Sequence, residues 1–448
     1  MFFDYLKQVF EENRDKKAMI LNNSEISYDE LLFKCNESKE LVEKTNVQQG
    51  SVVALVGDFS PNTVSLFLEL IRRKCIIVPL IHSEQLAQEK LFGIANPQFI
   101  FEIDKNENIH HREQHNLASN NYYESIRKIG HSGLVLFTSG TSGEPKAAVH
   151  DFEKLLKKFE KKGNTLVTIN FLMFDHWGGL NTMFHIISNA GTLVITKERT
   201  PEEVCKLIGN HRVELLPASP TFLNLLILSE LNKIYDLSSL KYISYGTEPM
   251  PNHTLSRLKK EFPKVKLLQT YGLIELGVMK SKSESDESLW VKLGGQGYQT
   301  RIVDNILQIK AESAMLGYIN AESPFTKDGW FITGDKVEQK GEYVKILGRE
   351  SEIINIGGEK VYPQEVENVI LGMKNVAEVT VFSEKNAIIG NIVCANIRLI
   401  SQQEKNVFIK ELKLYCRKRM QAYKVPIKIN LTSENQTSAR NKKKRFVG

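Results

Sequence analysis

The segment LVLFTSGTSGEPKAAVH, residues 134–150, carries the strongest structural signal in this chain. It begins with four apolar residues, LVLF, which predict a buried strand. The loop that follows combines glycines, hydroxyls and a lysine. Such a loop can hold a phosphate chain, because glycines admit close backbone N–H groups, hydroxyls donate hydrogen bonds and lysine supplies positive charge. The candidate phosphate-binding residues are Thr138, Ser139, Gly140, Thr141, Ser142, Gly143 and Lys146.

This loop differs from a Walker A sequence, because Lys146 follows Pro145 instead of a glycine and is not followed by Ser or Thr. A plain surface turn is the usual interpretation of a segment rich in Gly and Ser. Two hydroxyl pairs, two glycines and a Pro-Lys pair directly after a strand favour a phosphate-binding loop instead.

The composition is typical of a globular protein with two or more domains. The chain has 448 residues, of which 42% are hydrophobic and 25% are charged. Its formal net charge of +6 suits small polyanions such as nucleotides and does not call for nucleic acid, so we expect no nucleic-acid partner.

The cysteines and the N-terminal residues indicate where in the cell the protein is expected. Five dispersed cysteines without a CxxC pair indicate reduced thiols. Phe3, Leu6 and Phe10 recur at helical intervals, which predicts an amphipathic surface helix and not a signal peptide. Apolar runs stay well short of the roughly 20 residues that a membrane span needs. We therefore expect a cytoplasmic protein without a membrane span.

The order of predicted elements favours an α/β fold. Residues 1–130 alternate strand and helix patterns, which predicts a parallel sheet with helical crossovers. Residues 166–300 repeat this order. Residues 294–335 change to short β-rich pieces with glycine turns, which predict a small barrel or an antiparallel sheet.

A domain boundary is expected near residues 348–351, followed by a small α+β domain on a short linker. We therefore expect two domains. Residues 1–347 would hold two packed α/β subdomains and a small β-barrel-like subdomain, and residues 348–448 would form a mobile C-terminal domain.

Two further segments carry groups that suit a nucleotide. In QTYGLIELG, the Tyr271 ring beside Gly272 can lie against a purine, and Glu275 can ligate Mg²⁺ through oxygen. In GWFITGD, Asp335 ends a strand and can accept both ribose hydroxyls, as acidic residues do in dinucleotide sites. A β-turn Asp is the simpler interpretation of the Gly-Asp pair alone.

These segments, in this order, resemble the adenylate-forming enzymes, the superfamily of acyl-CoA synthetases, peptide-synthetase adenylation domains and luciferases. TSGTSGEPK resembles their phosphate-binding loop. SYGTEPMP resembles a segment that packs along the adenine, and ILGRESEIINIGGEKVYPQEVE resembles the hinge between their large and small domains. The resemblance covers essentially the whole chain. It implies ATP and Mg²⁺ as cofactors and a small-molecule carboxylic acid as substrate.

The resemblance also implies roles for single residues. Gly246, Thr247, Glu248 and Pro249 would lie along the adenine, Tyr271, Gly272, Asp335 and Arg349 would position the nucleoside, and Gly357 and Gly358 would line the tunnel for a pantetheine thiol. Taken alone, SYGTEPMP fits a plain strand end equally well. The chain departs from the family pattern at Ile274, where Thr is usual, and at the hinge residue Ser351, where Asp or Lys is usual.

The basic tail SARNKKKR resembles the family element that carries the catalytic lysine, which would be Lys442. Ser438 stands in place of Thr and Asn441 in place of Gly, and Asn tolerates a left-handed backbone. As a bare charge run, the tail would be a solvated patch or a nucleic-acid contact.

FLMFDHWGGLNTMF, residues 171–184, aligns with the acyl-pocket helix of the family, with His176 at the CoA-ligase position. Gly178 and Gly179 are expected to leave space on that helix for an acyl group. A cluster of His110, His111 and His115 lies in a polar stretch, which predicts a solvated loop and not a metal site.

The resemblance implies an acid–thiol ligase with Lys442, Glu275 and His176 as candidate catalytic residues. ATP would convert a fatty, hydroxy-fatty or aryl acid into an acyl-adenylate with release of pyrophosphate, and a thiol would then accept the acyl group. Coenzyme A and carrier-protein phosphopantetheine both stay open as that thiol, so an acyl carrier protein is a candidate partner. Two alternatives remain: amino-acid adenylation, raised by Asp175, and an impaired member kept as a scaffold.

Overall fold

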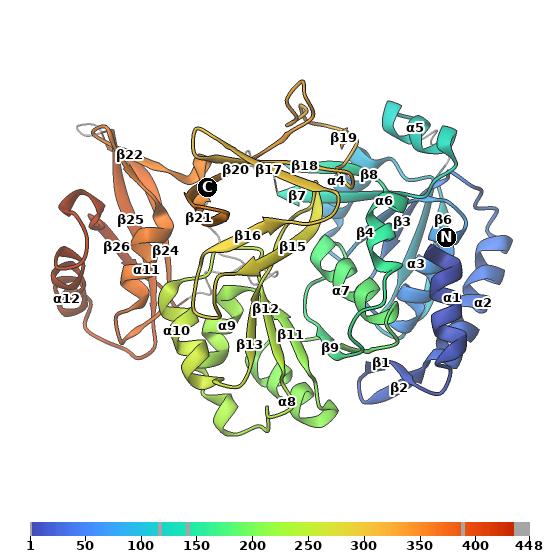
Figure 1. Cartoon of the computed structure of the whole chain (residues 1–448), viewed down its shortest axis with the longest axis horizontal. Helices are drawn as coiled ribbons and strands as arrows, with labels where there is room; N and C mark the ends of the chain where they lie inside the picture. The colour runs from blue at the N-terminus through green and yellow to red at the C-terminus, as the bar shows by residue number, and fades with distance from the viewer. Residues whose placement is uncertain (1, 115–118, 140–143, 387–389, 434–448) are drawn as a thin grey trace.

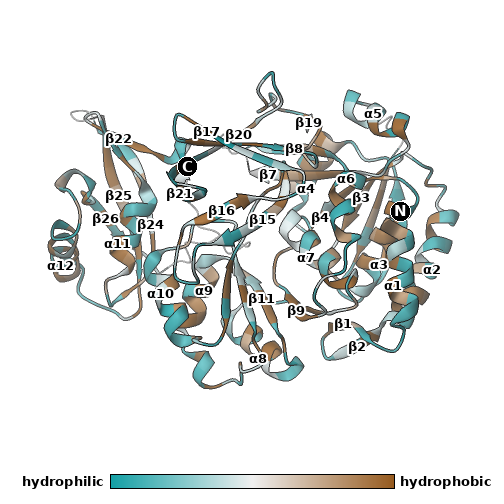
Figure 2. Cartoon of the chain, viewed as in Figure 1, coloured by the Kyte–Doolittle hydropathy of each residue, from teal (hydrophilic) through white to brown (hydrophobic). Residues whose placement is uncertain are grey.

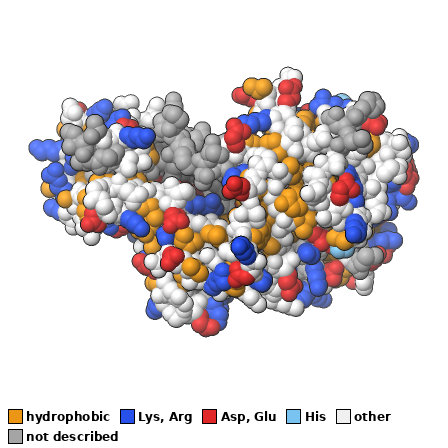
Figure 3. Space-filling view, turned by 90° about the horizontal axis from the view of Figure 1, so that it is seen from above, with side chains coloured by type: hydrophobic (Ala, Val, Ile, Leu, Met, Phe, Trp, Pro, Cys, Tyr) orange, Lys and Arg blue, Asp and Glu red, His pale blue; other side chains and the backbone are white. Residues whose placement is uncertain are grey.

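The computed structural model describes residues 2–114, 119–139, 144–386 and 390–433. They form two α/β lobes, an antiparallel sheet and a small α+β domain, which follow one another along the chain (Figure 1). Figure 2 shows hydrophobic residues gathered along inner strands and hydrophilic residues on outer helices such as α10. On the face drawn in Figure 3, basic and acidic side chains are interspersed.

The first lobe is built on a seven-stranded sheet in the order β19-β8-β7-β4-β3-β5-β6. Its central strands are parallel, as the sequence predicts, and the edge strands join antiparallel. The strands are β3 (Val52–Val56), β4 (Ile76–Leu80), β5 (Phe99–Ile103), β6 (Ile109–Glu113), β7 (Gly133–Ser139), β8 (Pro145–Asp151) and β19 (Gly317–Tyr318), with helices α3 (Pro61–Arg72), α4 (Gln85–Ala95), α5 (Asn121–Ile129) and α6 (Phe152–Leu156) and the 3₁₀ turn η1 (Lys157–Phe159).

The second lobe contains a sheet in the order β13-β12-β11-β9-β10-β1-β2, parallel except at β2. Its strands are β1 (Lys17–Leu21), β2 (Ser24–Ser27), β9 (Val167–Asn170), β10 (Thr192–Ile195), β11 (Leu215–Ala218), β12 (Tyr242–Tyr245) and β13 (Lys266–Gln269). The helices are α1 (Phe2–Glu12), α2 (Tyr28–Lys44), α7 (Trp177–Ile187), α8 (Pro201–His211), α9 (Pro220–Leu228) and α10 (Asn252–Glu261), with the turn η2 (Leu231–Lys233). The amphipathic helix predicted at the N-terminus is α1.

The two parallel sheets share one hydrophobic core. Leu55 of β3 and Leu193 of β10 are fully buried in the same cluster, together with the aromatic rings of Phe67 and Phe184. Helices α3 and α7 therefore lie between the sheets. Parallel strands covered on both faces read as continuous apolar runs, which is why they were readily predicted from the sequence.

An antiparallel sheet in the order β14-β15-β16-β21-β20-β18-β17 follows the second lobe. Its strands are β14 (Tyr271–Leu273), β15 (Gly277–Ser283), β16 (Val291–Gly294), β17 (Tyr298–Val303), β18 (Ile306–Ala311), β20 (Phe331–Lys340) and β21 (Tyr343–Arg349). The barrel-like closure does not occur among the described residues, because β14 and β17 are the two free edges. The sheet buries its apolar face against Ala148 and Tyr318 of the first lobe instead of against itself.

The last region is a small α+β domain with its own hydrophobic cluster, which begins at Ile354. Its elements are the turn η3 (Glu350–Glu352), β22 (Ile354–Ile356), β23 (Glu359–Val361), α11 (Pro363–Leu371), β24 (Val376–Asn386), β25 (Gly390–Leu399), α12 (Lys405–Arg417), the turn η4 (Ala422–Lys424) and β26 (Lys428–Leu431). Helix α11 begins at Pro363, as Pro favours at a first turn. The boundary between residues 347 and 348 stays a prediction.

The histidine cluster was predicted wrongly as a loop. His110 and His111 lie in the edge strand β6, opposite Glu102 and Phe101 of β5, and His115 lies outside the described residues. Strand β6 is exposed and lacks apolar alternation, so only pairing with β5 makes it a strand. In the part of the chain that the structure describes, no three potential metal-binding side chains come together, and no helix is long and apolar enough to cross a membrane.

Candidate active site

Asp335, Tyr271 and Arg349 meet at one end of the antiparallel sheet. Asp335 in β20 pairs directly with Arg349 in β21. The Tyr271 hydroxyl donates a 2.5 Å hydrogen bond to Asp335 Oδ2, and Arg349 Nε lies 3.4 Å from Oδ1. Burial raises the pKa of the Asp335 carboxyl, which the Arg349 guanidinium opposes. Burial also holds the pKa of Tyr271 well above its ordinary value, so the phenol stays a donor.

The turn before Asp335 fixes the position of its carboxylate. The backbone N–H of Asp335 donates to Thr333 Oγ1 at 3.0 Å, and that hydroxyl donates to the carbonyl of Leu307 at 2.7 Å. Gly334 between them has a φ of +72°, which favours glycine. Each residue of the Thr-Gly-Asp motif therefore has a local structural task.

Glu275 lies in the turn between β14 and β15 and contacts the first lobe. Its Oε1 accepts a 2.5 Å hydrogen bond from the hydroxyl of Tyr318 on β19. The Tyr318 ring also lies 5.5 Å from the ammonium of Lys146, measured to the ring centroid. The charge of Glu275 raises the pKa of Asp335. The carboxylates and cations predicted from distant segments therefore lie within electrostatic reach of one another.

The sequence analysis missed Tyr318. It belongs to a two-residue strand with no motif of its own, and only the pairing of β19 with β8 brings it beneath Lys146 and Glu275. Burial raises the pKa of its phenol above the ordinary value, followed by the charge of Glu275. Tyr318 therefore holds the Glu275 carboxylate as a hydrogen-bond donor.

The donor set around Glu275 fits Mg²⁺. This ion is usually held by one or two carboxylates and by phosphate oxygens of the substrate, not by a cage of protein ligands alone. Glu275 supplies one such carboxylate, and the Lys146 ammonium beside the Tyr318 ring could attract the phosphate oxygens that complete the metal's ligands; no group of three protein ligands occurs among the described residues.

The segment from Gly246 to Pro249 is tightly built. A Cβ on Gly246 would lie 2.4 Å from Thr270 Oγ1, and Thr247 adopts a φ of +71°. Glu248 Oε1 accepts a 2.8 Å hydrogen bond from the backbone N–H of Thr221 in the first turn of α9. The Glu248 carboxylate thus caps a helix N-terminus, and its placement along an adenine stays a prediction.

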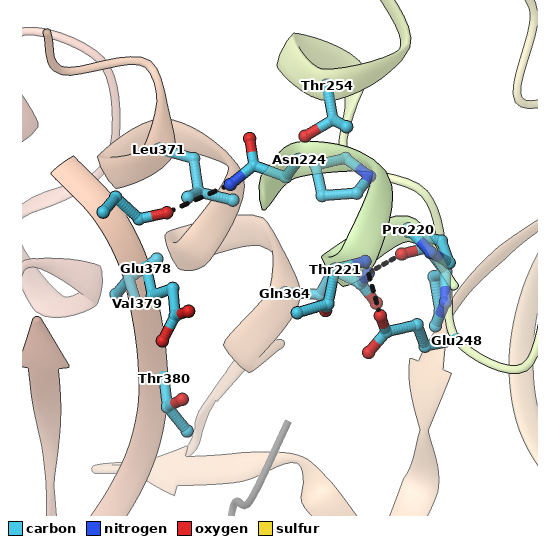
Figure 4. Close-up of a pocket in the computed structure, with 13 residues that line it drawn as sticks. Pro220, Thr221, Asn224, Glu248, Thr254, Gln364, Leu371, Glu378, Val379 and Thr380 are labelled. Carbon is cyan, nitrogen blue, oxygen red and sulfur yellow. Dashed lines mark hydrogen bonds between the residues drawn. The ribbon is translucent and has the colours of Figure 1, made fainter. Parts of the chain in front are cut away.

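A small cavity of about 30 Å³, lined by both apolar and polar residues, lies between this segment and the C-terminal domain (Figure 4). Asn224 Nδ2 donates to the carbonyl of Ala377 at 3.0 Å, and Gln364 Nε2 donates to the carbonyl of Pro249 at 2.9 Å. Gln364 Oε1 has no partner among the described residues, although the residue is buried. The cavity is large enough to hold a water molecule, and the two amide side chains give this interface its direct hydrogen bonds.

His176 is the N-cap of α7. Its Nδ1 accepts a 3.0 Å hydrogen bond from the backbone N–H of Gly178. The space expected at the two glycines is absent: a Cβ on Gly179 would lie 2.2 Å from the Met173 carbonyl oxygen, and one on Gly178 would lie 2.6 Å from Leu172 Cδ1. Close helix–backbone packing, and not room for an acyl group, explains the glycine pair.

Gly357 and Gly358 form the tip of the β22–β23 hairpin, with φ values of +54° and +92°. Both are exposed, and a Cβ on either would meet nothing within 4 Å. Ser351 lies in η3, directly after Arg349 ends β21. The roles of the hairpin in a thiol tunnel and of Ser351 as a hinge stay predictions.

Several predicted site residues are not described. Gly140, Thr141, Ser142, Gly143 and Lys442 lie outside the described residues, and only the backbone of Ser139 is described. Thr138 at the end of β7 pairs with Lys146 in β8, so the two ends of the predicted phosphate loop lie side by side. Gly272 in β14 packs closely against Val278, 2.9 Å from where its Cβ would lie.

Two family models match the chain: the AMP-binding enzyme model over residues 6–312 and the AMP-binding enzyme C-terminal domain model over residues 365–443. Among curated relatives, the 2-succinylbenzoate–CoA ligase of Bacillus subtilis is 27% identical, over 71% of this chain and 69% of its own. A long-chain-fatty-acid–CoA ligase of Bacillus subtilis is also 27% identical, over 86% of this chain and 74% of its own.

Solved structures show the same fold. The anthranilate CoA ligase AuaEII with anthranoyl-AMP superposes with a TM-score of 0.80 at 18% identity, covering 99% of this chain and 95% of the other. ATP-bound MatB from Rhodopseudomonas palustris gives a TM-score of 0.81 at 20% identity, covering 98% and 97%. The chain belongs to the AMP-binding enzyme family and is an AMP-forming acid–thiol ligase.

Proposed function

We propose that Tyr271, Asp335, Arg349, Glu275 and Lys146 form the nucleotide half of the ligase site. The meeting of Tyr271, Asp335 and Arg349 carries this proposal, since it presents a buried carboxylate beside a cation at the end of a strand. In the reaction, an acid carboxylate attacks the α-phosphate of ATP, pyrophosphate leaves, and a thiol then displaces AMP from the acyl-adenylate.

Asp335 would accept the ribose hydroxyls. Its carboxylate already accepts from the Tyr271 phenol and lies beside the Arg349 guanidinium, so its charge is compensated while buried. Both ribose hydroxyls are donors, and a fixed carboxylate can accept them together. The Tyr271 hydroxyl orients Asp335, and its ring is packed in the core of the antiparallel sheet, so a contact of that ring with the base stays a prediction.

Lys146 and Glu275 would act on the triphosphate. Lys146 offsets the negative charge of the departing pyrophosphate, and Glu275 would hold Mg²⁺, which when bound screens the phosphates and stabilises the charge that develops in transfer. Tyr318 contacts both residues and so ties the phosphate loop of the first lobe to the carboxylate of the antiparallel sheet.

The two half-reactions would use different parts of the C-terminal domain. Lys442 would stabilise the transition state of adenylation, and the Gly357–Gly358 tip would line the path of the thiol in the second step. In the described arrangement that tip is exposed, so thiol transfer requires the domain, residues 348–448, to rotate about a hinge near Arg349 and Ser351.

Coenzyme A is the acceptor we propose first, and the phosphopantetheine of an acyl carrier protein is the second. Relatives named for 2-succinylbenzoate and for long-chain fatty acids support an aryl or fatty acid. The five cysteines are free thiols, as in a reducing compartment, which supports a cytoplasmic location. The buried Asp175 keeps amino-acid adenylation as the alternative, and the intact Tyr271–Asp335 pair speaks against a scaffold role.

ATP–pyrophosphate exchange tests the proposal. The purified full chain is supplied with ATP, Mg²⁺ and a panel of aryl, fatty and amino acids, and label exchange is measured for each. Exchange with one acid class, followed by thioester formation when coenzyme A is added, is the expected result. The variant Asp335→Asn should raise the KM for ATP. Exchange only with amino acids, or no exchange with any acid, would overturn the proposal.

A further inference from the structure

His150 is a fully buried histidine that no step of the proposed reaction uses. It lies in β8, opposite Leu134 of β7. Successive side chains of a strand alternate between its two faces, so His150 points to the same side as Ala148. Ala148 packs in the cluster that contains Leu276, in the turn between β14 and β15. The imidazole therefore lies on the side of β8 that faces the turn with the proposed metal ligand.

Main-chain hydrogen bonds fasten that turn to β8. The carbonyl of Glu275 accepts from the N–H of Met315 at 2.8 Å. The N–H of the next residue, Leu316, donates to the carbonyl of Val149 at 2.7 Å. Val149 directly precedes His150 in the strand. The backbone that carries Glu275 is thus tied to β8 through one short segment, and the imidazole lies at this junction.

The two ring nitrogens of His150 complete no hydrogen bond of ordinary geometry with the described residues. The backbone of Ile274 and that of Ser313 nevertheless lie close enough to act on the ring, because both raise its pKa. Burial is the larger effect and lowers the pKa of His150 to about 4, so the imidazole is neutral and has one N–H donor. This donor lies beside the backbone of the residue that directly precedes Glu275.

The fold alone does not require a histidine at this position. A buried polar ring without completed hydrogen bonds is less favourable than a phenyl ring in the same space, because its polar atoms have lost water without gaining a partner. An unsatisfied buried group in a native protein therefore calls for an explanation. Hydrogen bonds at active sites often tighten only in the complex with substrate. The position of His150 favours a task that begins when the nucleotide binds.

We propose that His150 is a positioning residue for Glu275: its N–H completes a hydrogen bond with the backbone of Ile274 when ATP binds with Mg²⁺, and so holds the Glu275 carboxylate toward the metal. The inference rests on the proposed function, because it deepens the role of Glu275 in that site. Tyr318 holds the carboxylate through Oε1, and His150 fixes the backbone behind it. The two residues together leave the second carboxylate oxygen to the metal.

The dependence of ATP binding on Mg²⁺ tests this inference without the reaction. The dissociation constant of ATP is measured by calorimetry on the purified full chain, with EDTA and with Mg²⁺, and the ratio of the two values gives the contribution of the metal. His150→Phe keeps a planar ring and removes both nitrogens. It should lower this ratio roughly tenfold, the lower end of what outer partners of metal ligands contribute. The dissociation constant in EDTA should stay unchanged.

Further variants separate positioning from packing. His150→Asn and His150→Gln each carry an amide donor, and at least one of them should keep most of the ratio. His150→Phe should melt at the same temperature as the wild-type chain or higher, and His150→Leu is measured beside it in case the larger ring overpacks the core. Thr168→Val on β9 is the matched control. It also removes a buried polar atom without a partner among the described residues, but in the second lobe, so the ratio should stay unchanged.

The possible failures are distinguishable. An unchanged ratio in both His150→Phe and His150→Leu would overturn the inference and leave the proposed function standing. A lowered ratio that neither amide variant restores would also overturn it, since packing and not a donor would then hold the turn. Glu275→Gln tests the proposed function separately, because an unchanged ratio in that variant would overturn the metal-binding role of Glu275 itself.

Discussion

Tyr271 and Asp335 lie 64 residues apart and share a buried hydrogen bond of 2.5 Å from the phenol to the carboxylate. The bond joins the first strand of the antiparallel sheet to its longest strand, at the place where Arg349 supplies positive charge. The acidic group proposed for the ribose is therefore held from both sides by the protein.

Removing the phenol should loosen this carboxylate. We expect Tyr271→Phe to raise the KM for ATP several-fold and to lower the free energy of unfolding by about 1–3 kcal/mol, because a buried acceptor loses its donor. Urea unfolding and pyrophosphate exchange measure the two effects. Tyr242→Phe on β12 is the control, since the hydroxyl of Tyr242 makes no hydrogen bond with the described residues. Equal effects of the two variants would contradict the role of Tyr271.

Lys442 should act in the first half-reaction alone. Lys442→Ala is expected to abolish pyrophosphate exchange while it spares thioester formation from a supplied acyl-adenylate, because only adenylation develops charge at the α-phosphate. Each half-reaction is followed separately with the purified chain. Loss of both activities to the same extent would show that the two steps do not divide in this way.

The polar contact between the domains should favour one half-reaction. Gln364→Ala removes the hydrogen bond to the Pro249 carbonyl and is expected to slow adenylation about two- to tenfold, without slowing transfer from supplied acyl-adenylate. Stopped-flow measurement of both steps checks this. Gln403→Ala, which removes a surface contact within the C-terminal domain, is the matched control and should change neither step.

Gly179, at the start of α7, should contribute to the stability of the fold. In Gly179→Ala, the new methyl would lie 2.2 Å from the Met173 carbonyl oxygen, so the helix must move or the chain must strain. We expect a loss of about 1–3 kcal/mol in the free energy of unfolding, typical of overpacking. Thermal and urea unfolding measure it, with Gly93→Ala in α4 as control, because a Cβ there meets nothing within 4 Å.

The sequence predicted correctly those elements that have a regular hydrophobic pattern bounded by turn residues. Buried parallel strands such as β3, the amphipathic helix α1 at the N-terminus, and the family membership were all predicted correctly. The errors arose where tertiary contacts decide. Strand β6 forms only because β5 offers an edge, and the antiparallel sheet stays open because the first lobe covers its apolar face.

The candidate site was also predicted only in part, because some of its residues lie in local motifs and others are brought together by tertiary contacts alone. Asp335 and Arg349 were singled out because their motifs are local, and the strand register brings them together, while their roles toward a nucleotide stay predictions. Tyr318 was missed, since a two-residue strand carries no pattern.

The contact between the domains is reciprocal: Asn224 reaches a carbonyl of the C-terminal domain, and Gln364 reaches a carbonyl of the N-terminal region. Each amide side chain therefore binds a backbone carbonyl, a group that every residue has whatever its side chain is. Substitutions at Ala377 and Pro249 leave these carbonyl acceptors in place, so the contact depends on Asn224 and Gln364 and not on the side chains of the residues that they face. A C-terminal domain from a homologue that keeps an amide at the position of Gln364 should consequently still dock on this N-terminal region.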